Sequence, residues 1–185
     1  MIHNGLAMYA PERIPAWRAA VALAPAPARR ELLIWGAHGG AGTSTLAALL
    51  PGRDMGALRT EADYRYPAPV CGTGATVVAC RCTTWSAIKA SAAIRALSRA
   101  GGGVSVLAVV SDGWPEPDIA TAWFRLLSAQ AGAVIRVPFV PWLRLCNDAA
   151  PAHLQARLPR SARTALARIR AVTGISVPDV PYPAP

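Results

Sequence analysis

The chain has 185 residues, a formal net charge of +9 and a hydrophobic fraction of 53%, with only 16% charged residues. This length suits one domain, and the apolar content is high enough to offset the entropy lost on ordering, so wholesale disorder is excluded. The longest apolar runs, such as residues 104–110, are far shorter than the roughly 20 residues that cross a bilayer, and we expect no membrane span.

The cysteines favour a reducing, cytoplasmic location. Cys71, Cys80, Cys82 and Cys146 match neither a metal-binding nor a thioredoxin-like spacing. Cys80 and Cys82 lie in an apolar run, where a thiol is most often a small buried side chain.

The positive charge comes almost entirely from arginine, since the chain has 18 arginines and a single lysine, Lys89. Such a charge permits salt-sensitive attraction to nucleic acid or to an acidic protein.

The first elements are predicted from the pattern of apolar and turn residues. Residues 1–30 are rich in Pro and Ala without sustained periodicity, which predicts a partly ordered N-terminal arm before a domain over residues 31–174. A strand is predicted at 32–36, then a glycine-rich turn and a helix over 43–50 that Pro51 and Gly52 stop. Residues 53–74 contain no convincing strand and are interpreted as a surface loop.

Strands and helices alternate in the rest of the domain, and a Pro-rich tail is predicted from 175 to 185. Because the strands are continuously apolar, the fold class is predicted as α/β, with a parallel sheet of about four or five strands flanked by helices. Ligands of such sheets bind beyond the carboxyl ends of the strands. The predicted elements are strand 75–81, helix 85–100, strand 104–110, helix 118–129, strand 133–137 and helix 160–172.

One motif suggests chemistry, the glycine-rich stretch from Gly36 to Thr45 between the first strand and the first helix. Glycines let the backbone curl so that successive N–H groups point inward, and the helix that follows adds partial positive charge. A phosphate or another anion is the ligand expected here. The alternative is a tightly packed turn with no ligand.

Residues 38–45 resemble the deviant Walker A motif, K-G-G-x-G-K-[ST]-T, of the ParA/MinD class of P-loop ATPases, and the chain also resembles ParA-like proteins of actinobacteria. The resemblance implies a truncated P-loop NTPase-like fold, ATP or another nucleotide as ligand, and Mg²⁺ held by Ser44. It also implies base-binding residues at Asp112, Pro138 and Phe139. The phosphate-binding residues it implies are His38, Gly39, Gly40, Ala41, Gly42, Thr43, Ser44 and Thr45.

The chain departs from this motif at both lysines, whose positions hold His38 and Thr43. A threonine hydroxyl cannot supply the positive charge that a lysine places on the β- and γ-phosphates. We therefore expect little or no hydrolysis, and no efficient NTPase. Arg53, Arg59, Arg81 or Arg136 could supply the missing positive charge. The sequence does not show which of these four arginines lies near the loop.

A second departure is the absence of a hydrophobic strand ending in Asp before residue 76. Asp54 and Asp63 are therefore interpreted as solvated surface charges, which leaves Ser44 without an acidic partner for Mg²⁺. His38 is expected to be solvated, and Trp35 to pack in the core rather than stack on a base. Asp112 suits a base-binding residue, a metal ligand or a turn residue.

Three functions are compatible with these features. The first is a degenerate P-loop protein that binds a nucleotide or phosphate and acts as a regulatory or scaffolding partner of another protein. The second is an interaction module that uses an arginine-bearing surface, including helix 160–170, for DNA or an acidic protein. The third is an active ATPase in which arginines replace the lost lysine. The oligomeric state does not follow from the motif, because the signature lysine that reaches across the family's dimer is missing.

Overall fold

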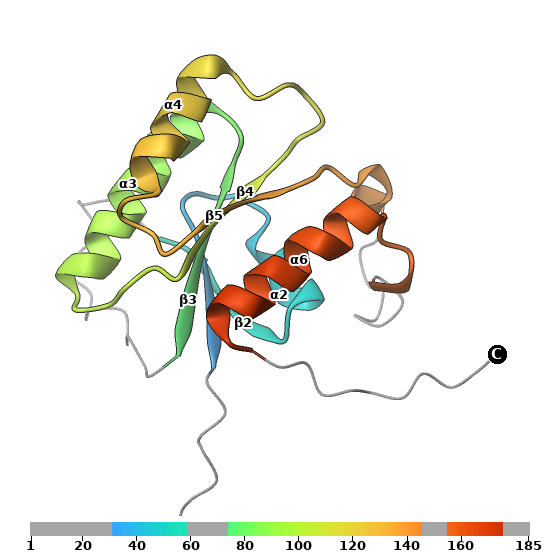
Figure 1. Ribbon diagram of the computed structural model, residues 1–185, viewed down its shortest axis with the longest axis horizontal. Helices are drawn as coiled ribbons and strands as arrows, with labels where there is room; N and C mark the ends of the chain where they lie inside the picture. Colours follow the sequence, from blue (N-terminus) through green and yellow to red (C-terminus); the bar gives the residue numbers. More distant parts are fainter. Residues whose placement is uncertain (1–30, 59–73, 146–154, 176–185) are drawn as a thin grey trace, which may run out of the picture.

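The computed structural model describes residues 31–58, 74–145 and 155–175, and these form an α/β fold around one five-stranded parallel sheet (Figure 1). The sheet has the order β2-β1-β3-β4-β5, which confirms the predicted parallel sheet flanked by helices. The elements are β1 (Leu32–Gly36), α2 (Thr43–Leu49), β2 (Gly52–Ala57), β3 (Ala75–Arg81), α3 (Thr84–Arg99), β4 (Val106–Val110), α4 (Asp118–Leu127), β5 (Val134–Val137), the 3-10 helix η3 (Pro141–Leu145) and α6 (Arg160–Thr173).

Several predictions fall outside the described residues. These are the N-terminal arm, residues 176–185 of the tail, and the side chains of Arg59, Asp63, Cys71 and Cys146. Among the helices that the structure does describe, none combines the length and the apolar character needed to cross a membrane.

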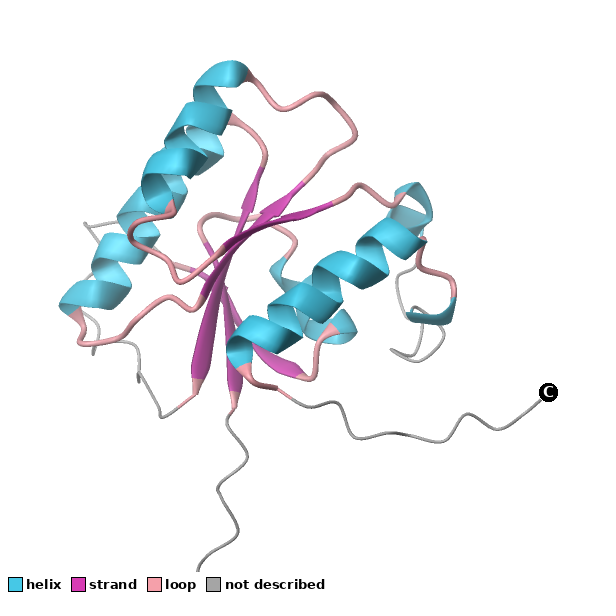
Figure 2. Ribbon diagram, in the orientation of Figure 1, coloured by secondary structure: helices cyan, strands magenta, loops and turns pink. Residues whose placement is uncertain are grey.

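The sheet lies between two helical layers, as Figure 2 shows, with α3 and α4 on one face and α2 and α6 on the other. The central strands are apolar on both faces because each face is covered: Val77 and Ala79 pack toward α2 and α6, whereas Val78 and Cys80 pack toward α3 and α4. This double burial explains why their sequences read as continuous apolar runs. Cys80 and Cys82 are both buried free thiols, as predicted.

The prediction of a surface loop over 53–74 is wrong for its first residues, which form the edge strand β2. This strand pairs in parallel with β1, with Leu32 opposite Gly52 and Ile34 opposite Asp54. Its sequence, GRDMGA, contains glycines and charged residues that are poor strand formers, and most of it is exposed. Strand β2 is extended because it pairs with β1. Its own residues therefore give little indication of a strand. Residues 59–73 lie outside the described part.

The C-terminal helix is attached to α2 by hydrogen bonds as well as by apolar packing. Gln155 Nε2 and Arg170 NH2 each donate to the Leu49 carbonyl oxygen, both over 3.1 Å. That carbonyl belongs to the last turn of α2, where helical carbonyls lack partners within the helix. Partial burial lowers the pKa of Arg170, so this contact places a desolvated guanidinium on a helix end that favours positive charge.

Candidate functional site

The glycine-rich loop lies where the sheet changes the side on which its helices run. The loop after β1 leads to α2 on one face, and the loop after the neighbouring strand β3 leads to α3 on the opposite face (Figure 1). The two loops therefore diverge at the carboxyl edge of the sheet. This is the position at which open parallel sheets bind ligands.

The loop is open on its outer side. Gly40 and Gly42 have φ values of 74° and 92°, a left-handed conformation that favours glycine. A Cβ atom added to Gly39 or Gly40 would meet nothing within 4 Å. Outside the helices and strands, no hydrogen bond of standard geometry joins the main-chain N–H groups of Gly39 to Ser44 to a described residue, although Gly39 and Gly40 form a turn. These amides are consequently available to an anion.

The base of the loop is closed by Thr43, which occupies the position of the motif's second lysine. A Cβ atom built on Gly36 would lie 2.6 Å from Thr43 Oγ1, so the threonine side chain lies directly against Gly36. Only 8% of Thr43 is exposed. This hydroxyl therefore packs beneath the loop and brings no positive charge to its open side.

Positive charge comes instead from Arg81, the last residue of β3. Its Nε donates a 2.8 Å hydrogen bond to the Gly40 carbonyl oxygen. Of the other described arginines considered from the sequence, Arg53 forms an ion pair with Glu31 and Arg136 forms one with Glu116. Because β3 is the strand beside β1, Arg81 is the one that the topology brings to the glycine loop.

His38 is not solvated as predicted, because it joins the loop to the beginning of α3. Its Nε2 lies 2.8 Å from Ser86 Oγ and its Nδ1 lies 2.7 Å from the Gly39 carbonyl oxygen. A carbonyl can only accept, so Nδ1 donates to Gly39, and Nε2 pairs with the Ser86 hydroxyl. Ser86 is 1% exposed, so this serine–histidine pair positions the loop and does not offer a nucleophile to a substrate.

Ser44 has an acidic partner, which corrects the expectation that it lacks one; Asp54 is exposed as predicted but lies on strand β2 and not in a loop. The Ser44 hydroxyl donates a 2.6 Å hydrogen bond to Asp54 Oδ2, and Asp54 Oδ1 accepts from the Gly56 N–H group over 2.8 Å. The contact exists because β2 pairs with β1 and so carries Asp54 past the start of α2. In the sequence, the only indication of this contact was the spacing of ten residues between Ser44 and Asp54. That spacing brings the two side chains together only because residues 52–57 form strand β2, which was not predicted.

A hollow of about 130 Å³ extends from the glycine loop toward the loop after β5. Gly42 and Arg81 line one side, and Pro138 and Phe139 line the other. The guanidinium of Arg144 lies over the Phe139 ring, 4.7 Å from its centroid. The structure thus brings Pro138 and Phe139, two of the three residues that the resemblance implies for base binding, to a hollow beside the glycine-rich loop, and it adds Arg144, which no sequence pattern indicated.

Asp112 serves a turn beside this hollow. Its Oδ1 accepts from the Trp114 N–H group over 3.1 Å and from the Cys82 thiol over 3.4 Å. The Trp114 hydrogen bond is the main reason that the pKa of Asp112 is lowered, whereas burial raises the pKa of the Cys82 thiol. The turn contacts the loop after β5, since a Cβ atom on Gly113 would lie 2.8 Å from the ring of Phe139.

A second hollow, of about 310 Å³, lies on the α4 side of the same edge and contains a strong ion pair. Glu116 accepts from Nε and NH2 of Arg136, both over 2.8 Å, and from the Thr121 hydroxyl over 2.7 Å. The Arg136 hydrogen bonds are the main reason that the pKa of Glu116 is lowered from about 4.5. The pair fixes the loop between β4 and α4 to strand β5.

Replacement of this carboxylate is expected to cost stability only at neutral pH. A lowered folded-state pKa stabilises the fold above the ordinary value near 4.5, and this contribution disappears as the pH falls through the lowered pKa. Glu116→Gln should therefore lower the free energy of unfolding by about 1 kcal/mol at pH 7, since the pair is bidentate but half exposed. Urea denaturation at neutral pH and near pH 3 measures the difference, which should shrink in acid.

Glu31→Gln is the control for this variant, because Glu31 and Arg53 are 3.9 Å apart and mostly exposed. It should change stability by no more than a few tenths of a kcal/mol at either pH. An equal loss for Glu116→Gln at both pH values would show that the carboxylate charge is not what stabilises the loop.

Comparisons with family models, with curated proteins and with solved structures gave no match to this chain. Within the described residues, no group of three or more His, Cys, Asp or Glu side chains is placed to hold a metal ion by itself. The site therefore rests on its own geometry: open amides, one arginine at the loop and a hydroxyl–carboxylate pair.

Proposed function

We propose that this protein binds a nucleotide or another phosphate compound at the glycine loop, hydrolyses it little or not at all, and acts as a regulatory or scaffolding partner of another protein. The observation that carries the proposal is the set of main-chain N–H groups from Gly39 to Ser44, which donate no hydrogen bond of standard geometry to a described residue, in a loop whose Gly39 and Gly40 border open space at the carboxyl edge of the sheet. Inward-pointing amides in such a loop form a concave anion site.

Arg81 supports an anion at this loop. Its Nε is held by the Gly40 carbonyl, and its side chain also lines the hollow next to Gly42. The two terminal nitrogens of the guanidinium remain as donors toward phosphate oxygens, which arginine binds in a bidentate manner. The protein thus has a fixed cation beside the amides, supplied by a strand end rather than by the motif.

Slow or absent hydrolysis follows from Thr43. Phosphoryl transfer is accelerated by positive charge placed on the oxygens where charge develops in the transition state. The Thr43 side chain is packed against Gly36 beneath the loop, and the guanidinium of Arg81 is attached to the outer part of the loop at Gly40. The arrangement favours binding of a phosphate group over its transfer.

Ser44 and Asp54 fit the donor set for Mg²⁺ that the P-loop resemblance implies. One hydroxyl and one carboxylate, 2.6 Å apart, match the usual protein share of a magnesium site whose remaining ligands are phosphate oxygens and water. A bound Mg²⁺ would neutralise part of the phosphate charge. We accordingly expect nucleotide binding to be strengthened by Mg²⁺ and to depend on both side chains.

Thermal unfolding with ATP, with and without Mg²⁺, tests the proposal. A ligand that binds only the folded state at 100 times its dissociation constant adds about 2.7 kcal/mol of stability, so millimolar ATP should raise Tm by several degrees. Arg81→Ala should remove most of this shift. Arg53→Ala is the matched control, because Arg53 loses the same charge from the exposed edge strand and faces Glu31.

The same experiment separates the alternatives. An unchanged Tm at millimolar nucleotide would contradict the proposal and favour the interaction module. The alternative of an interaction module is supported by three arginines on α6, Arg160, Arg163 and Arg168. They are exposed and form none of the ion pairs seen between described residues. Steady phosphate release that disappears in Arg81→Ala would instead identify an active ATPase.

A further inference from the structure

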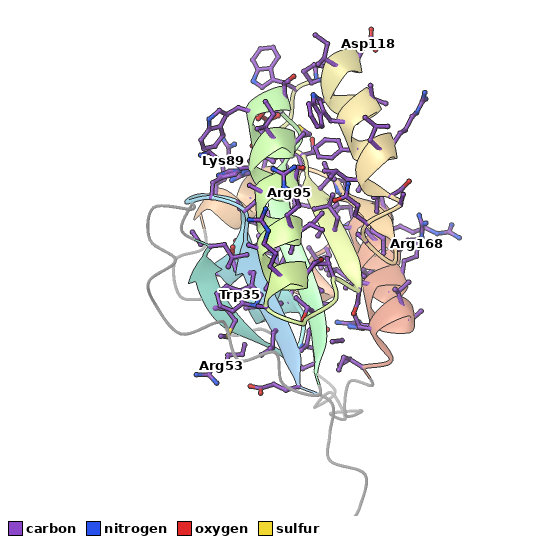
Figure 3. All side chains as sticks on the ribbon, turned by 90° about the vertical axis from the view of Figure 1, so that its left-hand side faces the viewer. Trp35, Arg53, Lys89, Arg95, Asp118 and Arg168 are labelled. Carbon is purple, nitrogen blue, oxygen red and sulfur yellow. The ribbon has the colours of Figure 1, made fainter. Side chains whose placement is uncertain are left out.

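The outer faces of α3 and α4 expose large apolar side chains that neither the core nor the proposed phosphate site uses. Trp85 and Ile88 on α3 are 56% and 48% exposed, and Ile119 and Leu126 on α4 are 65% and 67% exposed. The two helices lie side by side on one face of the sheet, which is the face turned toward the viewer in Figure 3. We call these four residues the apolar face.

The helix α4 shows that this exposure is not a by-product of core packing. Its core contacts come from Ala120, Phe124 and Leu127, which are at most 1% exposed. Ile119 and Leu126 are seven positions apart, about two helical turns, and so lie on the same side of the helix. A helix on the surface of a domain normally carries polar residues there, and large exposed apolar side chains gathered on one face mark interaction surfaces.

The charged side chains on α3 are all positive, whereas α4 carries charges of both signs. Helix α3 carries Lys89, Arg95 and Arg99 and no acid, and α4 carries Arg125 with Asp118 at its first turn. Lys89 Nζ lies 5.5 Å from the centroid of the Trp85 ring, so one cation lies directly over the apolar face. Figure 3 labels Lys89 and Arg95 on α3 and Asp118 at the far end of α4.

Arg95 is fixed by its own helix. Its NH1 donates a 3.1 Å hydrogen bond to Ser91 Oγ, one turn earlier. An oriented guanidinium loses less entropy when it meets a carboxylate than a freely rotating one. The surface therefore combines exposed apolar side chains on both helices with positive charge along α3.

We propose that the apolar face binds an amphipathic helix with acidic flanks, presented by a partner protein. Helices dock on two-helix surfaces through apolar residues at i, i+3, i+4 and i+7, and Ile119 and Leu126 have the matching spacing. Glutamate or aspartate beside that apolar stripe would meet Lys89 and Arg95. The proposal does not rest on the proposed function, since the apolar face touches the glycine loop only where Trp85 contacts His38, and its test requires no nucleotide.

The same charges disfavour the other occupants. A second copy of the chain on this face would bring the same excess of positive charge to both sides of the interface, where like charges repel. Nucleic acid would use the cations but has no need of exposed Ile119 and Leu126, since its binding is dominated by phosphate contacts. An acidic helix uses both features at once.

The test uses the full chain and two synthetic peptides of about 18 residues, roughly five helical turns. One peptide has leucine along one face and glutamate on both flanks, and the other has lysine in place of each glutamate. Calorimetric titration should show binding of the acidic peptide only. Leu126→Asp and Ile119→Asp should each weaken it at least about tenfold. Arg95→Glu should weaken the acidic peptide and improve the basic one.

Arg168→Glu is the matched control, because it makes the same charge change on the exposed face of α6 (Figure 3). It should leave binding of the acidic peptide unchanged. An equal loss in Arg168→Glu would reduce the effect to general electrostatic attraction and overturn the proposal. Absence of binding by the acidic peptide would also overturn it.

Two further outcomes would assign the surface to this chain itself and so contradict the proposal. The first is a wild-type dimer in sedimentation that Leu126→Asp dissociates, which would identify a second copy as the occupant. The second is an Ile119→Cys variant whose thiol reacts with maleimide in urea but not in the native chain, which would identify one of the chain's own segments. Rapid native labelling of that thiol and a monomeric wild type support the proposal.

Discussion

Gly42→Asp is expected to abolish nucleotide binding, whereas Gly42→Ala should retain most of it. Gly42 has φ of 92°, a conformation that costs an L-residue about 1–2 kcal/mol, so both variants should lose similar stability. Their Cβ atoms would make ordinary contact with Val110, 3.6 Å away. Only aspartate adds a carboxylate to the hollow that Gly42 shares with Arg81.

Fluorescence titration with a labelled ATP analogue measures the difference, and the dissociation constant of Gly42→Asp should rise at least about a hundredfold, equivalent to roughly 2.7 kcal/mol. The thermal unfolding of both variants without ligand is the control for misfolding. Equal affinities in the two variants would show that the ligand does not approach this part of the loop.

Phe124→Ala should produce the largest loss of stability, about 3–5 kcal/mol. Phe124 is 1% exposed and belongs to the core cluster between α4 and the sheet, so its truncation leaves a cavity in a region packed against β4. Leu126→Ala, two residues away in the same helix, should cost no more than about 0.5 kcal/mol because Leu126 is 67% exposed.

Urea denaturation of both variants compares them directly. A large loss in Leu126→Ala would show that its side chain is covered in the native protein, and it would count against a free apolar face. A small loss in Phe124→Ala would contradict the packing of α4 itself.

The sequence was sufficient for the elements whose local pattern agrees with their environment. Strands buried on both faces read as apolar runs, and α3 and α6 were predicted to within about one residue of their observed ends. The strand β4 is two residues shorter than predicted, and Val104 forms only an isolated bridge with Ala131. The loop between β1 and α2 could be predicted because glycines allow backbone conformations that other residues rarely adopt.

The contacts that complete the site were not predictable because they join residues far apart in the chain. Ser86 and His38 are separated by 48 positions, and Arg81 and Gly40 by 41. Four arginines were equivalent candidates in the sequence, and among the three that the structure describes the order of the strands selects Arg81. The contact of Asp54 with Ser44 was missed for a related reason, since an exposed edge strand has no apolar pattern of its own.

The side chain of His38 connects the glycine-rich loop to the apolar face on α3 and α4. Its ring lies on the glycine loop and also contacts the ring of Trp85, with the centroids 4.8 Å apart and the planes inclined at 58°. A phosphate that moves His38 would alter Trp85, and a partner that moves Trp85 would alter the loop. Binding events that share one movable group are thermodynamically linked, and each must change the affinity of the other by the same factor. Nucleotide binding at the loop would in this way change the affinity of the exposed side of α3 for a partner without a change in fold.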